Sequence, residues 1–202
     1  MHLNFAPLPG TQQARRGLFV DHTGTLLETP ENGFLACPED IVFTPGALDS
    51  LFHAGQNGWN IYLIGNEHAV QAELITKETW IEIHENMIEI MRTHGVSVTR
   101  SYICIEHPDE SELNKRDSVY RLPNTGAMYH AAQTEGISLP RSWVIGDHTE
   151  DLVAGWRAGC HMAGVRTGLA LGDGTLHVEP EILADDLSAA VRELTSGMPM
   201  NR

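Results

Sequence analysis

The sequence predicts an α/β fold with a doubly wound, Rossmann-like parallel sheet that carries helices on both faces. Two observations predict it. Short apolar runs alternate with longer amphipathic segments, and these segments end on glycine, as helices commonly do. Strands that alternate with helices pair in parallel through right-handed crossovers. With 202 residues, 42% of them apolar, the chain can bury its core without a disulfide or a metal.

The expected elements follow in chain order. Strands are expected at 17–20, 60–65, 96–105, 142–147 and 161–167, and helices at 46–58, 76–95, 126–136 and 148–159. The helix at 76–95 carries an apolar stripe, which is typical of a core or subunit contact. We expect an N-terminal arm at 1–15, a single domain at 16–195 with an inserted polar loop at 108–125, and a C-terminal tail at 196–202. The short spacing between the first two strands predicts a minimal cap domain or none.

The charge balance bears on the class of partner. The chain has 13 basic and 27 acidic residues, a net charge of -14, which would repel a phosphate backbone, so nucleic acid is not expected as a partner. No membrane partner is expected either, because no segment resembles a signal peptide or approaches the roughly 18 apolar residues of a membrane span. The three cysteines are far apart and odd in number, which indicates a reducing compartment and a cytoplasmic protein. The oligomeric state stays open.

Polar residues follow three of the predicted strands. Asp21 follows the first strand, Gly65 and Asn66 end the second, and Asp147 ends the fourth, with Asp151 one helical turn later. Ligands of doubly wound sheets bind at the carboxyl ends of the strands. A few carboxylates suit Mg²⁺, with waters and a substrate phosphate completing its shell. The alternative is that such aspartates only cap helices.

Several stretches resemble the haloacid dehalogenase (HAD) superfamily of phosphatases. The opening motif is "FVDHTGTLLETPENGFL", and the last acidic motif is "VIGDHTEDLVAGWRAG". In order, "TPGALDSLFHAGQNGWNIYLIGNEHAV", "YICIEHP", "YRLPNTGAM" and "LADDLSAAV" resemble the branch of D,D-heptose 1,7-bisphosphate phosphatases and histidinol phosphate phosphatases. The similarity runs from about Leu18 to Val191 and implies a HAD-like fold and a small phosphorylated substrate.

The resemblance implies roles for individual residues. Asp21 matches the catalytic nucleophile that takes the phosphoryl group as an aspartyl phosphate. The metal ligands would be Asp21, the backbone carbonyl of Thr23, and Asp147, with Asp151 supporting the metal site. Substrate-binding positions are expected at Thr25, Gly65, Asn66 and Arg121. For Thr25, the basis is that the glycine turn could present backbone N–H groups to a phosphate.

Three positions depart from the family pattern. Thr23 stands where these phosphatases have the aspartate that acts as general acid and base, a loss that typically costs about 10²- to 10⁴-fold in rate. Gly65 replaces a phosphate-binding serine or threonine, and Leu122 replaces a lysine that offsets phosphate charge. Other branches of the superfamily, including transport ATPases, also have a threonine at the position of Thr23, so this residue is compatible with activity.

Histidines in the motif loops are candidate replacements for the missing acid and base. His22, His68 and His148 all fall there, and histidine titrates near neutral pH. Each also has a structural alternative, for example as an exposed loop residue.

Zinc is not expected. Close relatives in this branch hold zinc with a cysteine, a histidine two places on, and a Cys-x-Cys pair. The aligned residues here are Cys104, Glu106, Ser118 and Tyr120, with His107 displaced by one position, so one good ligand of four remains.

Two functions stay open. The first is a Mg²⁺-dependent phosphatase that hydrolyses a small metabolite, such as a sugar phosphate or histidinol phosphate, through an aspartyl phosphate on Asp21. The alternative is a degenerate HAD-like protein, weakly active or inactive, that binds metal, phosphate or a protein partner. The intact nucleophile and metal set favours the enzyme.

Overall fold

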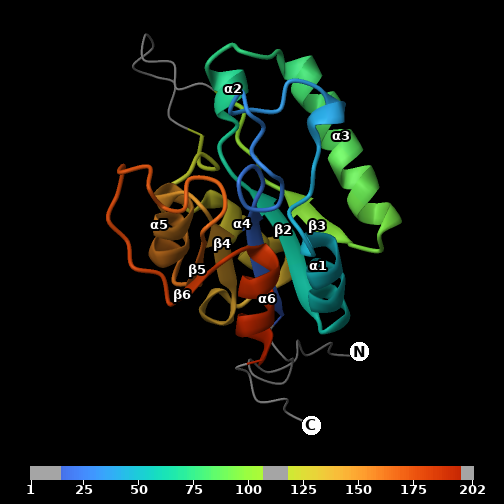
Figure 1. The fold of residues 1–202 in the computed structure, drawn as a ribbon. Helices are drawn as coiled ribbons and strands as arrows, with labels where there is room; N and C mark the ends of the chain where they lie inside the picture. Colours follow the sequence, from blue (N-terminus) through green and yellow to red (C-terminus); the bar gives the residue numbers. More distant parts are fainter. Residues whose placement is uncertain (1–14, 107–117, 197–202) are drawn as a thin grey trace, which may run out of the picture.

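The computed structural model describes residues 15–106 and 118–196, which form one six-stranded parallel sheet in the order β3-β2-β1-β4-β5-β6 (Figure 1). The strands are β1 (Arg16–Asp21), β2 (Trp59–Ile64), β3 (Val98–Ser101), β4 (Trp143–Gly146), β5 (His161–Val165) and β6 (Ile182–Ala184). Together with the helices on its two faces, this sheet confirms the predicted doubly wound fold.

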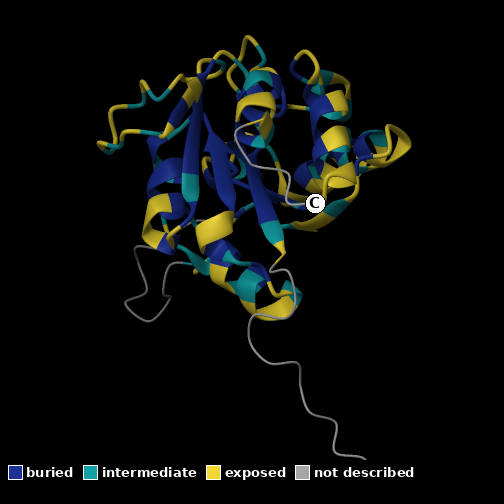
Figure 2. Ribbon diagram, turned by 90° about the horizontal axis from the view of Figure 1, so that it is seen from below, coloured by how far each residue is buried: buried dark blue, intermediate teal, exposed yellow. Residues whose placement is uncertain are grey.

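Helices cover both faces of the sheet. They are α1 (Ala47–Gln56), α2 (His68–Gln71), α3 (Lys77–Thr93), α4 (Gly126–Glu135), α5 (Thr149–Ala158) and α6 (Leu187–Ser196), with short 3₁₀ helices at η1 (Pro38–Asp40) and η2 (Leu139–Arg141). One apolar cluster contains the inner faces of α1, α3 and α6, and a second contains those of α4 and α5. The inner strands β1, β2, β4 and β5 are largely buried between them, whereas the edge strands β3 and β6 carry exposed residues. Other exposed residues lie on loops and outer helix faces (Figure 2).

The helix ends follow the sequence signals. The side chain of Thr76 accepts a hydrogen bond from the Thr79 N–H (3.1 Å) and so caps the start of α3. Gly136 and Gly159, which follow α4 and α5, adopt the left-handed conformation with φ of 70° and 77°. The glycines at the ends of these two helices therefore terminate them as predicted.

Some elements differ from the prediction. β3 occupies only part of the predicted strand at 96–105, because Cys104 leaves the regular strand and forms an isolated bridge with Asn66. The short α2 and β6, and α6, were not predicted as a helix or strand. The N-terminal arm, most of the inserted loop and the C-terminal tail lie outside the described residues, so the domain boundaries stay a prediction.

Among the described helices, none is long and apolar enough to cross a membrane.

The strand order determines where polar residues meet. β1 lies between β2 and β4, with Asp21 paired with Ile64 and Val20 paired with Ile145. The chain runs outward in opposite directions from β1 and β4, so these strands flank the topological switch point at which such sheets bind ligands. The residues that follow β1, β2 and β4 therefore lie around one crevice.

Candidate active site

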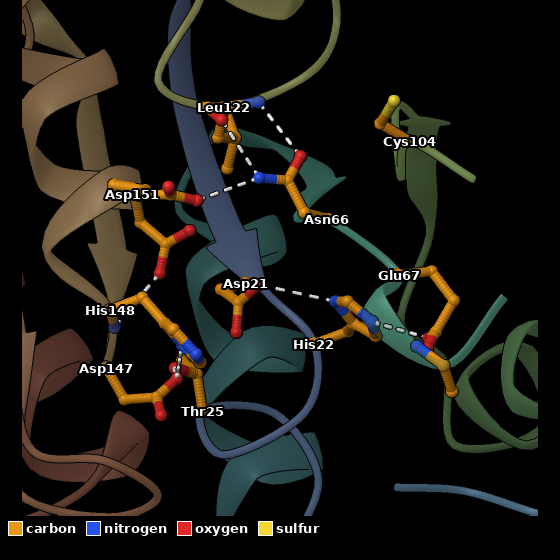
Figure 3. Close-up of polar contacts among 12 residues, drawn as sticks. Asp21, His22, Thr25, Asn66, Glu67, Cys104, Leu122, Asp147, His148 and Asp151 are labelled. Carbon is orange, nitrogen blue, oxygen red and sulfur yellow. Dashed lines mark hydrogen bonds and ion pairs between the residues drawn. The ribbon is translucent and has the colours of Figure 1, made fainter. Parts of the chain in front are cut away.

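Three carboxylates converge at the carboxyl ends of β1 and β4. Asp21 is the last residue of β1, Asp147 follows β4, and Asp151 lies in the first turn of α5 (Figure 3). One ligand atom from each, together with a ring nitrogen of His148, lies within 4.8 Å of the others. These groups face a cavity of about 230 Å³. The predicted metal residues other than Thr23 thus form one cluster, and Thr23 lines the same cavity.

Asp21 has one free carboxylate oxygen. Its side chain is buried, yet Oδ2 has no hydrogen-bond partner among the described residues, while Oδ1 contacts His22. Burial raises the pKa of Asp21, with a contribution from the negative charge of Asp147, and His22 opposes this increase. A buried oxygen without a partner is costly unless a ligand satisfies it. Oδ2 and the two neighbouring carboxylates fit the hard oxygen set of a divalent cation.

Asp147 is held rigidly from two sides. The hydroxyl of Thr25 donates to its Oδ1 (3.0 Å), and the N–H of Leu169 donates to its Oδ2 (2.8 Å). Burial alone would raise the pKa of Asp147. The hydrogen bond and positive charge of His148, followed by the two donors, have the larger effect and lower this pKa below its ordinary value. Gly24 (φ +95°) is required beside it, because a β-carbon there would lie 2.4 Å from Asp147 Oδ2. Asp147 is therefore an ionised carboxylate in a preset orientation.

His148 brings positive charge to the carboxylates. Its Nδ1 lies 3.4 Å from Asp147 Oδ1. Partial burial lowers the pKa of His148. The neighbouring carboxylates have the larger effect, Asp147 first and then Asp21 and Asp151, and they raise this pKa to about 9. Asp151 accepts the backbone N–H of His148 (3.2 Å). Burial, followed by the charge of Asp21, raises the pKa of Asp151 well above its ordinary value. Without a cation, the cluster thus resists carrying three negative charges.

His22 is buried between two carboxylates. Its Nδ1 lies 3.3 Å from Asp21 Oδ1, and its Nε2 lies 3.1 Å from Glu67 Oε2. The ring also meets Trp80 edge-on, with centroids 5.4 Å apart. Although burial by itself lowers the pKa of His22, Asp21 and Glu67 raise it well above 6.5. Glu67 was not singled out from the sequence, since its contact with His22 spans 45 positions.

Asn66 connects the loop after β2 to the segment around Leu122. Its Nδ2 donates to the Leu122 carbonyl and to Glu150 Oε2, both at 2.9 Å, and its Oδ1 accepts from the Leu122 N–H at 2.9 Å. The Leu122 side chain is buried in the apolar cluster of α4 and α5. Arg121 donates instead to Gln71 Oε1 (3.0 Å) and is not part of the cavity wall.

The cavity brings together most, but not all, of the predicted residues. Asn66, His68 and His148 line it with the acidic cluster. Thr25 is fully buried behind Asp147, so its side chain supports that carboxylate, and the predicted contact of its backbone with phosphate stays a prediction. Gly65 lies beside His22 and Asp21 but is not among the residues that line the cavity. Further lining residues that the sequence did not indicate are Thr29, Gly33, Phe34, Glu67, Ala69, Glu150, Gly168 and Leu169.

The positions aligned with a zinc site lie away from this cavity. Cys104 is buried, and its carbonyl accepts the Glu67 N–H (2.8 Å). Glu106, Ser118 and Tyr120 line a separate hollow with Cys104, whereas His107 lies outside the described residues. Among the residues that the structure describes, the metal-competent group is the acidic cluster.

Comparison with known proteins finds one family model and several relatives that match this chain. The family described as HAD-hydrolase-like matches residues 119–190. A D-glycero-D-manno-heptose-1,7-bisphosphate 7-phosphatase of Thermosynechococcus vestitus is 27% identical over 188 residues, covering 88% of this chain and 94% of that protein. The resemblance to the haloacid dehalogenase superfamily is confirmed. The bifunctional histidine biosynthesis protein HisB of Campylobacter jejuni is 27% identical over 180 residues, which cover 88% of this HAD-like chain but 48% of HisB. The HAD-like chain therefore spans about half the length of HisB.

Solved structures agree on the fold. The D,D-heptose 1,7-bisphosphate phosphatase of B. bronchiseptica, crystallised with magnesium and phosphate, superposes with a TM-score of 0.77 at 24% identity, covering 91% of this chain and 99% of that one. The corresponding phosphatase of Burkholderia thailandensis gives a TM-score of 0.63 at 19% identity, covering 90% and 99%. The relatives that carry phosphatase names support a hydrolase.

Proposed function

We propose that the protein is a Mg²⁺-dependent phosphatase that hydrolyses a small phosphorylated metabolite through an aspartyl phosphate on Asp21. The observation that carries the proposal is the unpartnered Oδ2 of Asp21, buried beside Asp147 and Asp151 at the switch point of a HAD-like sheet. The relatives named as heptose-1,7-bisphosphate 7-phosphatases, and the magnesium and phosphate in one related structure, support it.

Asp21, Asp147 and Asp151 would hold the cation with the carbonyl of Thr23, and the cation would neutralise charge on the substrate phosphate. An oxygen of Asp21 attacks phosphorus, and the bond from phosphorus to the alcohol oxygen breaks with its electron pair on that oxygen, which takes up a proton. Water then attacks the aspartyl phosphate, releases inorganic phosphate with loss of a proton, and restores the Asp21 carboxylate.

The proton donor is the weak part of this scheme, because Thr23 cannot serve at neutral pH. His148 is the strongest candidate among the described cavity residues, because its ring is partly exposed in the cavity, whereas carboxylates engage both ring nitrogens of His22. In the metal-free protein Asp147, Asp21 and Asp151 raise the pKa of His148, and a cation held by the same carboxylates would oppose this increase. Since Thr23 replaces the usual acid, we expect slower turnover than in a phosphatase with an aspartate at this position.

The substrate belongs to the class of small phosphate monoesters. A cavity of about 230 Å³ accommodates a sugar phosphate or an amino-alcohol phosphate such as histidinol phosphate. The relatives named as heptose bisphosphate phosphatases support the first class, and the relative named as a histidine biosynthesis protein is consistent with the second. The guanidinium of Arg121 donates one hydrogen bond to the neutral Gln71 and keeps its charge, which helps to lower the pKa of His68 in the cavity wall after the effect of burial. Arg121 therefore remains a candidate cation for a substrate phosphate.

One observation favours the alternative of a degenerate HAD-like protein that binds metal, phosphate or a partner. Leu122 stands where the resembling family has a lysine, and its side chain is buried in an apolar cluster. A charged side chain would be costly in that environment, so the positive charge that the lysine brings to the phosphate is missing here. The altered Thr23 and Gly65 point the same way.

Phosphate release from sugar phosphates, histidinol phosphate and an aryl phosphate distinguishes the two functions. With Mg²⁺, the phosphatase should release phosphate from at least one compound, and the Asp21→Asn variant should not. Equal release by both proteins, or none above the variant from any compound, would favour the degenerate protein.

A further inference from the structure

The contact between His22 and Asp21 is unusual for adjacent residues. Successive side chains of a strand point to opposite faces, so residues 21 and 22 should diverge. They meet because β1 ends at Asp21 and the chain turns at once: the His22 carbonyl accepts the N–H groups of Leu26 (2.9 Å) and Leu27 (2.8 Å). The turn brings the imidazole back over the end of the strand, where its Nδ1 faces Asp21 Oδ1.

Glu67 holds the other end of the imidazole. Its Oε2 lies 3.1 Å from His22 Nε2, and its Oε1 accepts the Ala69 N–H (3.0 Å) at the start of α2. The Glu67 N–H is itself bound to the Cys104 carbonyl. Glu67, His22 and Asp21 are all less than a tenth exposed. A carboxylate that is anchored to the backbone therefore fixes the ring, and the ring contacts one oxygen of Asp21 (Figure 3).

Gly65 supplies the space for this arrangement. A β-carbon at position 65 would lie 2.4 Å from His22 Nδ1 and 2.5 Å from Asp21 Oδ1, and the φ of +139° is itself unfavourable for other residues. A side chain at 65 and the observed position of His22 therefore exclude each other.

We propose that His22, held by Glu67 and accommodated by Gly65, is the positioning residue for Asp21. By engaging Oδ1 it fixes the plane of the Asp21 carboxylate and leaves Oδ2 free toward the cation and the phosphate. This inference rests on the proposed function for its effect on turnover. Its effect on the binding of Mg²⁺ does not depend on turnover. Groups that orient a metal-binding side chain typically change metal affinity or activity by about 10- to 100-fold.

Two conservative variants separate orientation from space filling. In His22→Asn, the amide places an N–H near the position of Nδ1 and keeps the donor to Asp21, but it does not reach Glu67. In His22→Gln, the longer side chain reaches the position of Nε2 and Glu67, but it has no donor near Asp21. Both variants should be measured with Glu67→Gln and the double variants, at one fixed pH, for Mg²⁺ affinity by calorimetry and for kcat and KM. His161→Asn is the matched control, because His161 also pairs with a carboxylate, Glu181 (2.6 Å), at the amino end of β5.

The proposal predicts that His22→Gln lowers kcat and Mg²⁺ affinity by roughly 10- to 100-fold with little change in KM, whereas His22→Asn retains most of both. In the wild-type background, Glu67→Gln should lower Mg²⁺ affinity and kcat. In the His22→Asn background, it should have no further effect on either. His161→Asn should behave as wild type. Equal losses in the two His22 variants, or a larger loss in His22→Asn, would overturn the proposal and indicate a role in packing.

Failure of the phosphatase is distinguishable from failure of this inference. If the wild-type protein releases no phosphate but Mg²⁺ affinity follows the predicted order, the positioning role of His22 is supported and the phosphatase is rejected. If turnover is present but indifferent to His22→Gln, the inference fails and the phosphatase stands. Absence of Mg²⁺ binding by the wild-type protein would overturn both.

Discussion

Replacing Asn66 with aspartate tests how the loop after β2 holds the segment around Leu122. The Asn66 amide donates to the Leu122 carbonyl and to Glu150, and its oxygen accepts from the Leu122 N–H. Asn66→Asp keeps the acceptor, removes both donor bonds and brings a second carboxylate within 2.9 Å of Glu150. One neutral and one charged hydrogen bond together account for about 2 to 4 kcal/mol. For a chain of this length we expect the Tm to fall by roughly 5 to 15 °C.

The assay is thermal and urea denaturation followed by circular dichroism. In the double variant Asn66→Asp, Glu150→Gln, the introduced amide can donate to the introduced carboxylate, so part of the lost stability should return. Asn32→Asp is the control. Among the described residues, Asn32 has one side-chain hydrogen bond, in which its Oδ1 accepts from the Phe34 N–H, and the carboxylate retains that bond. A double variant as unstable as the sum of the single variants would refute the reasoning, as would equal effects at positions 66 and 32.

Three further predictions concern the cluster itself. Thr25→Val removes a donor to Asp147, so Mg²⁺ affinity measured by calorimetry should fall roughly 10- to 100-fold. The control Thr195→Val, on α6, should leave Mg²⁺ affinity unchanged. Equal Mg²⁺ affinities of the two variants would contradict the supporting role of Thr25. In metal-free protein, His148 has a folded pKa of about 9 against an ordinary 6.5, so its stabilising contribution is complete below pH 6.5 and is lost as the pH rises through 9. The free energy of unfolding falls by at most about 3 kcal/mol, and by less than that because the ring reaches solvent. Urea denaturation should show this loss in the wild-type protein but not in His148→Gln. Identical pH profiles of the two proteins would disprove it. Gly65→Ala should cost about 2 to 5 kcal/mol through strain and overlap, and less in the His22→Ala background; the same cost in both backgrounds would exclude a clash with His22.

The positions of the main acidic residues follow from the sequence. Alternating strands and helices predict a parallel sheet, and in such a sheet residues at the carboxyl ends of neighbouring strands meet. The sequence therefore predicts that Asp21, Asp147 and Asp151 lie at the same edge of the sheet. That they meet depends on β1 and β4 being neighbours, which the structure shows. The helix α6 also has a sequence signal that could have identified it: Leu187, Ala190, Val191 and Leu194 have helical spacing and are buried together. β6 has no comparable signal, because it has three residues and one of them is exposed.

The contacts that orient these residues do not follow from the sequence. The pairing of His22 with Glu67 depends on the turn after β1 and on the start of α2, and neither periodicity nor spacing encodes it. Thr25 illustrates the same limit, since its hydroxyl contacts Asp147, 122 positions away in the chain, while the Leu169 N–H binds the other oxygen of that carboxylate. Arg121 is a comparable case: its identity suggests phosphate binding, while its contact with Gln71 depends on α2.

The central claim is that Asp21 becomes phosphorylated during turnover. The direct measurement is rapid acid quenching of the protein with a radiolabelled phosphate monoester and Mg²⁺, followed by counting of label on the denatured chain. The proposed function predicts a label on the wild-type protein that hydroxylamine releases, as it does from acyl phosphates, and no label on Asp21→Asn. Release of phosphate by the wild-type protein without such a label, or a label that persists in Asp21→Asn, would contradict it.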